Sequence, residues 1–97
     1  MLESFTIDTF SPLVGDTFAM HVDADHVLQL ELIHAASTGQ SNPSARRPFS
    51  LVFRGPPTPV AVQQIYQLHH PALGRFAPFL VPIGRDERGM LYEAVFT

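Results

Sequence analysis

The chain has 97 residues, a net charge of −3 and only 15% charged side chains, against roughly 25% in a typical globular protein. It contains no cysteine and no lysine, which excludes disulfide frameworks, thiolate zinc sites, cysteine nucleophiles, Schiff-base lysines and the lysine of a P-loop. Its six basic residues are arginines scattered along the chain, so no basic stripe is present and no nucleic-acid partner is expected.

The first predicted element is a single helical turn at about residues 9–14. Ser11 precedes Pro12 here, and proline suits the first position of a helix because its missing N–H is not needed there. We expect Phe10 and Leu13 from this turn to plug one end of a sheet formed by the rest of the chain.

Five segments then alternate between apolar and polar residues. This period of two is typical of a half-buried strand, because successive side chains point to opposite faces of the sheet. The segments are 17–22, 27–36, 49–54, 65–70 and 90–96. The residues predicted to form the core share one parity within each strand and are Phe18, Leu28, Leu30, Leu32, Phe49, Leu51, Phe53, Tyr66, Leu68, Val81, Tyr92 and Phe96.

Polar turn segments separate these strands. Residues 23–26 and 38–48 are rich in turn-forming residues. Residues 84–89 read GRDERG and predict a hairpin loop in which two arginines and two acids can pair among themselves. The sequence therefore predicts one all-β domain over residues 1–97. We expect a small antiparallel β-barrel or sandwich of five to six strands with a short N-terminal helical turn.

The N-terminal segment and the lengths of the apolar stretches indicate where the protein is expected to be located. The first segment, MLESFTIDTF, carries acidic residues and no arginine, so a signal peptide is not expected. The longest apolar stretch is far shorter than the ~20 residues that span a bilayer, so no membrane partner is expected. We expect a cytoplasmic protein, or one that is incorporated into a larger assembled particle.

Two adjacent histidines, His69 and His70, stand in the segment QLHHPALGRF. Adjacent strand residues point to opposite faces, so the two rings cannot easily share one metal ion. Pro71 and Gly74 follow, and both are turn residues. The segment is therefore interpreted as a hairpin corner with one histidine packed and one solvated, and no metal is predicted there.

A second group of metal-ligand residues stands in HVDADH. His21, Asp23 and Asp25 alternate, so they could line one side of a strand end and bind a cation. The stretch lacks the glycine and the distal glutamate of an EF-hand loop, and aspartate is common in hairpin turns. A turn is the favoured interpretation, and no metal or cofactor is predicted, with the cation site kept as an alternative.

Motifs of common enzyme classes do not occur in the sequence, including G-x-S-x-G, G-x-G-x-x-G, G-x-x-x-x-G-K and H-E-x-x-H. Glu31 and Glu93 could be neighbours across strands, as in a glycosidase carboxylate pair. Solvated charges on a sheet face are the favoured interpretation of both. No catalytic residue is predicted, and the protein is expected not to be an enzyme.

Four segments together resemble a known family. They are TFSPLVGDTF, PFSLVFRGP, IYQLHHPALG and FLVPIGRDERGMLYEAVF, and the resemblance covers nearly the whole chain except residues 37–47. They are similar to the DUF6916 family of short bacterial proteins, a domain of unknown function. The resemblance implies no activity, cofactor or catalytic residue. It favours an assembly role, with tail-collar-like proteins of phage-tail-like particles as partners.

These features favour a non-enzymatic protein-interaction or assembly subunit, part of a phage-tail-like or filamentous assembly. The low charge supports this hypothesis, as do the apolar residues Ile33, Val52 and Val95, which are expected to face outward. The predicted interface residues flank the 49–54 strand or lie on the outer face of the 90–96 strand, and they are Arg46, Arg47, Arg54, Leu91, Glu93 and Val95.

Two other functions remain as alternatives. One is a small-ligand-binding β-barrel, whose cavity would be lined by Phe49, Phe53, Tyr66 and Phe79. The other is a metal-dependent enzyme, whose ligands would be His21, Asp23 and His26.

The last strand, 90–96, has no proline and only one charge, whereas natural edge strands are commonly guarded by lysine or proline. At an edge of the sheet, such a strand would be able to pair with another chain. We therefore predict self-association through residues 90–97 together with the N-terminal segment 1–10. The alternative is that this strand is already paired on both sides.

Overall fold

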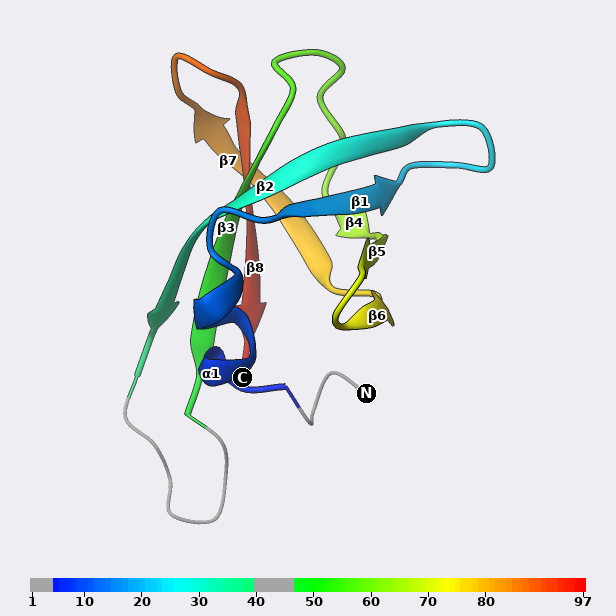
Figure 1. Cartoon of the computed structure of the whole chain (residues 1–97). Coiled ribbons are helices and arrows are strands. Elements are labelled where there is room, and N and C mark those ends of the chain that lie inside the picture. The colour runs from blue at the N-terminus through cyan, green and yellow to red at the C-terminus, as the bar shows by residue number, and fades with distance from the viewer. Residues whose placement is uncertain (1–4, 40–46) are drawn as a thin grey trace.

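The computed structural model describes residues 5–39 and 47–97, and these residues form a mostly-β fold (Figure 1). The elements in chain order are α1 (Ile7–Phe10), η2 (Ser11–Leu13), β1 (Thr17–His21), β2 (Val27–Ser37), β3 (Phe49–Gly55), β4 (Gln64–Ile65), β5 (Gln67–His70), β6 (Gly74–Phe76), β7 (Phe79–Arg85) and β8 (Met90–Phe96). Within the described residues, neither helical segment has the length and apolar character needed to cross a membrane.

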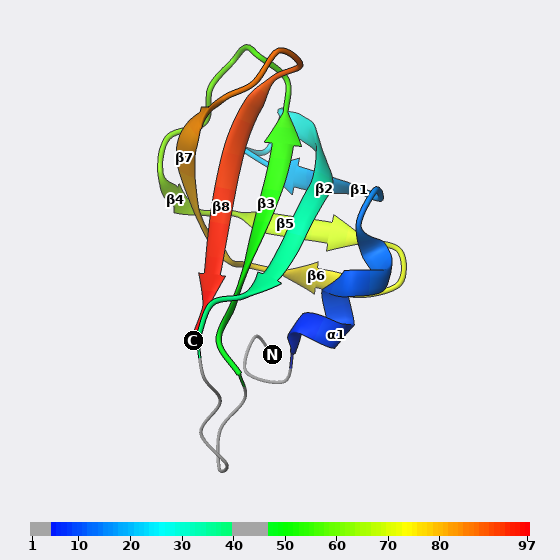
Figure 2. The same cartoon turned by 90° about the vertical axis from the view of Figure 1, so that its left-hand side faces the viewer.

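The strands form one antiparallel sheet that curls into a half-barrel (Figure 1; Figure 2). Its strand order is β4-β7-β8-β3-β2-β1-β5-β6, which gives eight strands. The predicted predominance of strands, their antiparallel pairing and the short N-terminal helical segment are confirmed. The finer prediction of a barrel or sandwich is not confirmed, since the strands form a single half-barrel sheet. The number of strands is also larger than the five to six that we expected.

One source of the larger number is the predicted strand 65–70, which the structure divides at Tyr66. Before Tyr66, β4 pairs with β7, and Ile65 lies opposite Phe79. After Tyr66, β5 pairs with β1, and Met20 lies opposite Leu68. The Tyr66 N–H donates to the carbonyl oxygen of Pro78 at 3.2 Å. The segment is counted as two strands because it changes partners at this residue.

Strand β8 lies inside the sheet. It pairs with β3 over its whole length, from Phe49 opposite Phe96 to Gly55 opposite Met90, and with β7 on its other side. The expectation that residues 90–96 form an exposed edge strand is therefore wrong. Its backbone groups are used within the sheet and are not available to pair with another chain. The N-terminal partner segment of that prediction lies partly outside the described residues.

The predicted alternation sorts most side chains correctly between the two faces. Ten of the twelve predicted core residues are buried, and Leu28 and Val81 are half-buried. Leu28 is more exposed because it lies next to the last residue pair of the β1–β2 hairpin, which extends beyond the sheet (Figure 1). Val81 lies opposite Glu93 on the outer face, and Leu80 takes the core position in β7.

The N-terminal helical segments close the end of the sheet where the C-terminus lies (Figure 2). They span residues 7–13 instead of the predicted 9–14. The predicted role of Phe10 is confirmed, since its side chain is fully buried, while Leu13 is half-buried against the core. The ring of Phe10 lies 5.4–5.9 Å from four other phenylalanine rings, those of Phe5, Phe49, Phe76 and Phe96.

Two buried tyrosines hold the loop between β3 and β4. The Tyr92 hydroxyl accepts a hydrogen bond from the Ala61 N–H at 2.9 Å, and the Tyr66 hydroxyl donates to the Val62 carbonyl at 2.6 Å. Burial raises the pKa of Tyr66 above its ordinary value. Both hydroxyls are therefore satisfied by loop backbone, as buried polar groups require.

Candidate functional site

Four of the six predicted interface residues lie together on the outer face of β3 and β8. Arg54 pairs with Leu91 across the two strands, Val52 with Glu93, and Ser50 with Val95. The side chains of Arg54, Leu91, Glu93 and Val95 alternate with the buried residues of these strands and point away from the core. Arg47 is exposed just before β3, and Arg46 lies outside the described residues. The outward-facing Val95 is exposed as expected, whereas Ile33 and Val52 are half-buried.

Arg54 is the centre of an ion-pair network that joins three parts of the chain. Its Nε and Nη2 donate to Asp86 Oδ2 at 2.9 and 2.7 Å, and its Nη1 donates to Glu31 Oε1 at 3.3 Å. Only 18% of the Arg54 side chain is exposed. We expected the charges of the 84–89 loop to pair among themselves, but Asp86 pairs with Arg54 instead. This arginine is thus engaged within the fold.

Asp86 also organises its own hairpin loop. Its Oδ1 accepts hydrogen bonds from the backbone N–H groups of Arg88 and Gly89, at 2.9 and 3.0 Å. The side-chain hydrogen bond from Arg54, followed by these backbone hydrogen bonds, lowers the pKa of Asp86 from 3.8 to about 2. The ionised carboxylate therefore stabilises the folded state at neutral pH.

The lowered pKa of Asp86 predicts a specific acid dependence of stability. The contribution of this carboxylate is complete above the unfolded pKa near 4 and is lost as the pH falls towards 2. We expect Asp86→Asn to lower the urea midpoint at pH 7 and the difference from wild type to shrink between pH 4 and pH 2. Urea unfolding at several pH values measures this, and an equal difference at pH 7 and pH 2 would contradict it.

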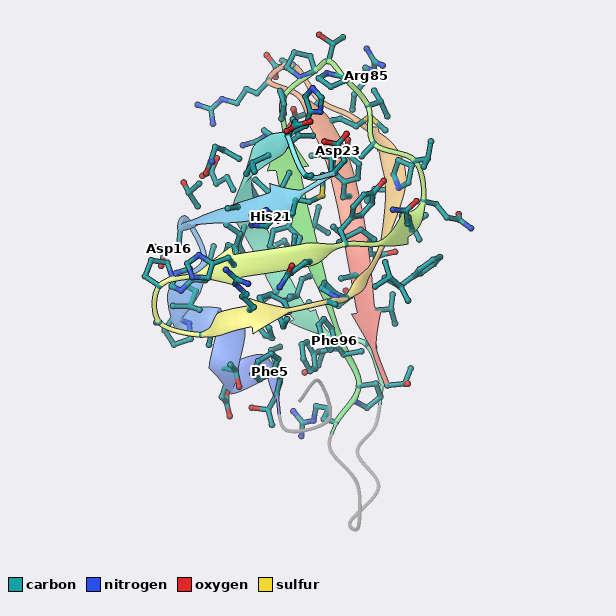
Figure 3. The ribbon with its side chains drawn as sticks, turned by 90° about the vertical axis from the view of Figure 1, so that its right-hand side faces the viewer. Phe5, Asp16, His21, Asp23, Arg85 and Phe96 are labelled. Carbon is teal, nitrogen blue, oxygen red and sulfur yellow. The ribbon has the colours of Figure 1, made fainter. Side chains whose placement is uncertain are left out.

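Of the adjacent histidines, His69 is exposed and His70 is buried, as predicted. The Nε2 atom of His70 lies 2.9 Å from Asp16 Oδ2, beside the end of β5 (Figure 3). Its Nδ1 accepts the Ala72 N–H at 3.0 Å, which places the ring proton on Nε2, facing the carboxylate. Both ring nitrogens are occupied, so this pair ties β5 to the N-terminal segment and leaves no nitrogen free to act as a general base.

The HVDADH segment forms a turn, as favoured. Asp23 Oδ1 accepts the Asp25 N–H at 2.9 Å and contacts His26 Nδ1 at 2.7 Å. The first of these hydrogen bonds, with His26 second, lowers the pKa of Asp23. His21 is the last residue of β1, and Asp23 follows in the loop before β2, above His21 and below Arg85 in Figure 3. In the described part of the chain, no three His, Asp or Glu side chains are placed to hold one metal ion.

The four aromatic residues considered for a ligand cavity do not share one environment. Phe49 and Phe53 are fully buried and Tyr66 is 4% exposed, so these three belong to the packed core. Phe79 is 50% exposed on the other side of the sheet. The predicted cavity lining is therefore not assembled.

Large apolar side chains are exposed on the outside of β4, β7 and β8, which lie side by side in Figure 2. Ile65, Phe79 and Val95 are 62%, 50% and 58% exposed, and we call these three residues the outer strip. They line one hollow of about 280 Å³. Ile65 and Phe79 are direct cross-strand neighbours. Three such side chains in one place form a contiguous apolar surface of the kind that marks interaction sites.

A family model described as "Domain of unknown function (DUF6916)" matches residues 5–96. The chain belongs to the DUF6916 family. No curated protein and no solved structure matches it. Family membership confirms the resemblance seen in the sequence, and the description attaches no activity to this DUF6916 domain.

Sequence reasoning identified Val95 in this DUF6916 domain but missed Ile65 and Phe79 as parts of the same surface. A signal was present, because Arg75 is the only arginine, lysine, aspartate or glutamate between Gly55 and Gly84. Depletion of charge is characteristic of interface cores. It could not show which of the many apolar residues in this stretch face outward on neighbouring strands.

Proposed function

We propose that this protein is a non-enzymatic interaction or assembly subunit that binds a protein partner, or further copies of itself, through the outer strip. The observation that carries the proposal is the exposure of Ile65, Phe79 and Val95 around one hollow. Burying three such side chains against a partner would contribute about 1–2 kcal/mol each, given that about half of each is still exposed.

The chemistry of the ionisable pairs supports a non-enzymatic role. His70 uses both ring nitrogens in the fold, and Arg54 is engaged by Asp86 and Glu31. The carboxylate of Asp23 is bonded within its own turn, to the Asp25 N–H and the His26 ring. A general acid or base needs a free, positioned atom facing a substrate.

We place the subunit in a cytoplasmic or particle-bound assembly, such as a phage-tail-like one. Electron microscopy of the purified complex would test this.

Site-specific photo-crosslinking in cells tests the outer strip. We expect a photoreactive residue at position 79 or 95 to give a discrete covalent adduct with one polypeptide. A second copy of the 10.7 kDa chain would double the mass and would show self-association. The matched control is position 27, because Val27 is 44% exposed but lies on β2, away from the strip. Adducts that are equally frequent at all three positions, or absent from 79 and 95, would contradict the proposal.

A further inference from the structure

Glu93 is a half-buried carboxylate surrounded by apolar side chains on the same outer face. Across the strands it lies opposite Val52 on β3 and Val81 on β7. Along β8, the next residues on that face are Leu91 and Val95, and Val95 belongs to the outer strip. The carboxylate therefore stands within an apolar surface that continues into the strip.

No cation of the described chain pairs with this carboxylate, since the ion pairs among these residues join other groups. Two basic residues lie on neighbouring positions of this face: Arg54 on β3 stands opposite Leu91, and His34 on β2 stands opposite Val52. The guanidinium group of Arg54 is directed to Asp86 and Glu31. Among the residues that the structure describes, Glu93 thus has no cationic partner, although its side chain is half-buried.

Covering such a residue with a purely apolar partner would be unfavourable. An unpaired carboxylate loses hydration when it is buried, and the loss is offset only if a cation and hydrogen bonds replace the water. Arginine is suited to this position because its planar group pairs with a carboxylate through two hydrogen bonds and its stem packs on apolar surface.

We infer that the outer strip and Glu93 form one docking surface for a protein segment that carries apolar side chains and one arginine or lysine, whose cation pairs with Glu93. The inference rests on the proposed function and adds the chemistry of the partner. The apolar part of the segment covers Ile65, Phe79 and Val95. The cation selects partners, because a neutral or acidic residue at its place would leave the carboxylate buried without a partner.

Two small compounds of the same shape distinguish the contribution of the Glu93 carboxylate from that of the apolar outer strip. Heptylguanidinium and the neutral heptylurea share an apolar chain and a planar head group, and differ in charge. We expect the cation to shift the amide resonances around Val81, Glu93 and Val95 saturably, and to bind at least ~10-fold more tightly than the urea. Glu93→Gln should remove this difference, whereas Glu87→Gln, in the exposed hairpin loop, should leave it unchanged.

Each outcome has a distinct meaning. Equal binding of the two compounds at the strip would overturn the role of Glu93 and leave the proposed apolar contact standing. Binding of neither compound at the strip, or binding only elsewhere, would overturn the docking surface itself. Dimerisation of the wild type in sedimentation, lost in Glu93→Gln but not in Glu87→Gln, would support the inference and identify a second copy as the source of the cation. The control for folding is the urea midpoint of Glu93→Gln. We expect it to equal or exceed that of wild type, and a midpoint in that range would establish that the variant is folded.

Discussion

Phe10→Ala is expected to lower the free energy of unfolding by about 3–5 kcal/mol. The side chain is fully buried, and its ring packs among four other phenylalanine rings at the end of the sheet. Truncation removes these contacts and leaves a cavity that the surrounding sheet cannot fill. Because small domains have only about 5–15 kcal/mol of stability, the change is a large part of the total. Urea unfolding followed by circular dichroism measures it.

Phe79→Ala is the matched control for this experiment. The substitution is chemically the same, but Phe79 is 50% exposed in the outer strip. We expect a loss of about 1 kcal/mol or less, because much of the ring is in contact with water in the folded state. Similar losses for Phe10→Ala and Phe79→Ala would show that the N-terminal segment does not close the core as described.

Gly89→Ala is expected to be destabilising by about 3 kcal/mol, the upper end of the range for overpacked sites. A Cβ atom at this position would collide with the carbonyl oxygen of Gly55 and come within 3.3 Å of Arg54 Cγ. The obstacle is the backbone of β3, which cannot move aside as a flexible side chain would. The substitution therefore pushes the β7–β8 hairpin away from β3 and strains the Asp86–Arg54 contact. Urea unfolding and the amide resonances of the hairpin measure this.

Gly39→Ala is the control for a glycine without such crowding. A Cβ atom there would lie 3.5 Å from Pro48 Cγ, an ordinary van der Waals contact. We expect a change within about 0.5 kcal/mol. A Gly89→Ala variant as stable as Gly39→Ala would mean that β3 and the hairpin loop are not packed as closely as the structure has them.

Strand faces could be predicted from the residues themselves, because alternation is a local property of the extended backbone. Tyr66, Leu68 and His70 are buried while Gln67 and His69 are exposed, in agreement with the predicted parity. The interface residues of β8 were placed on the outer face for the same reason. The prediction for Val81 is wrong because residues 79–83 read FLVPI and are all apolar, so the sequence has no alternation there that would identify the core face.

The sequence alone determined that the chain is a small antiparallel β protein, which strand faces are apolar, and that the turn residues of 23–26 and 84–89 separate strands, since all of these depend on near neighbours in the chain. Only the tertiary structure decided which strands pair, and hence that β8 is internal. It also decided that Asp86 meets Arg54, 32 residues away, and that Asp16 meets His70, 54 residues away. Such contacts depend on strand order and register, and many orders are compatible with the same alternation. The exposure of the outer strip and the apolar surroundings of Glu93 follow from that order.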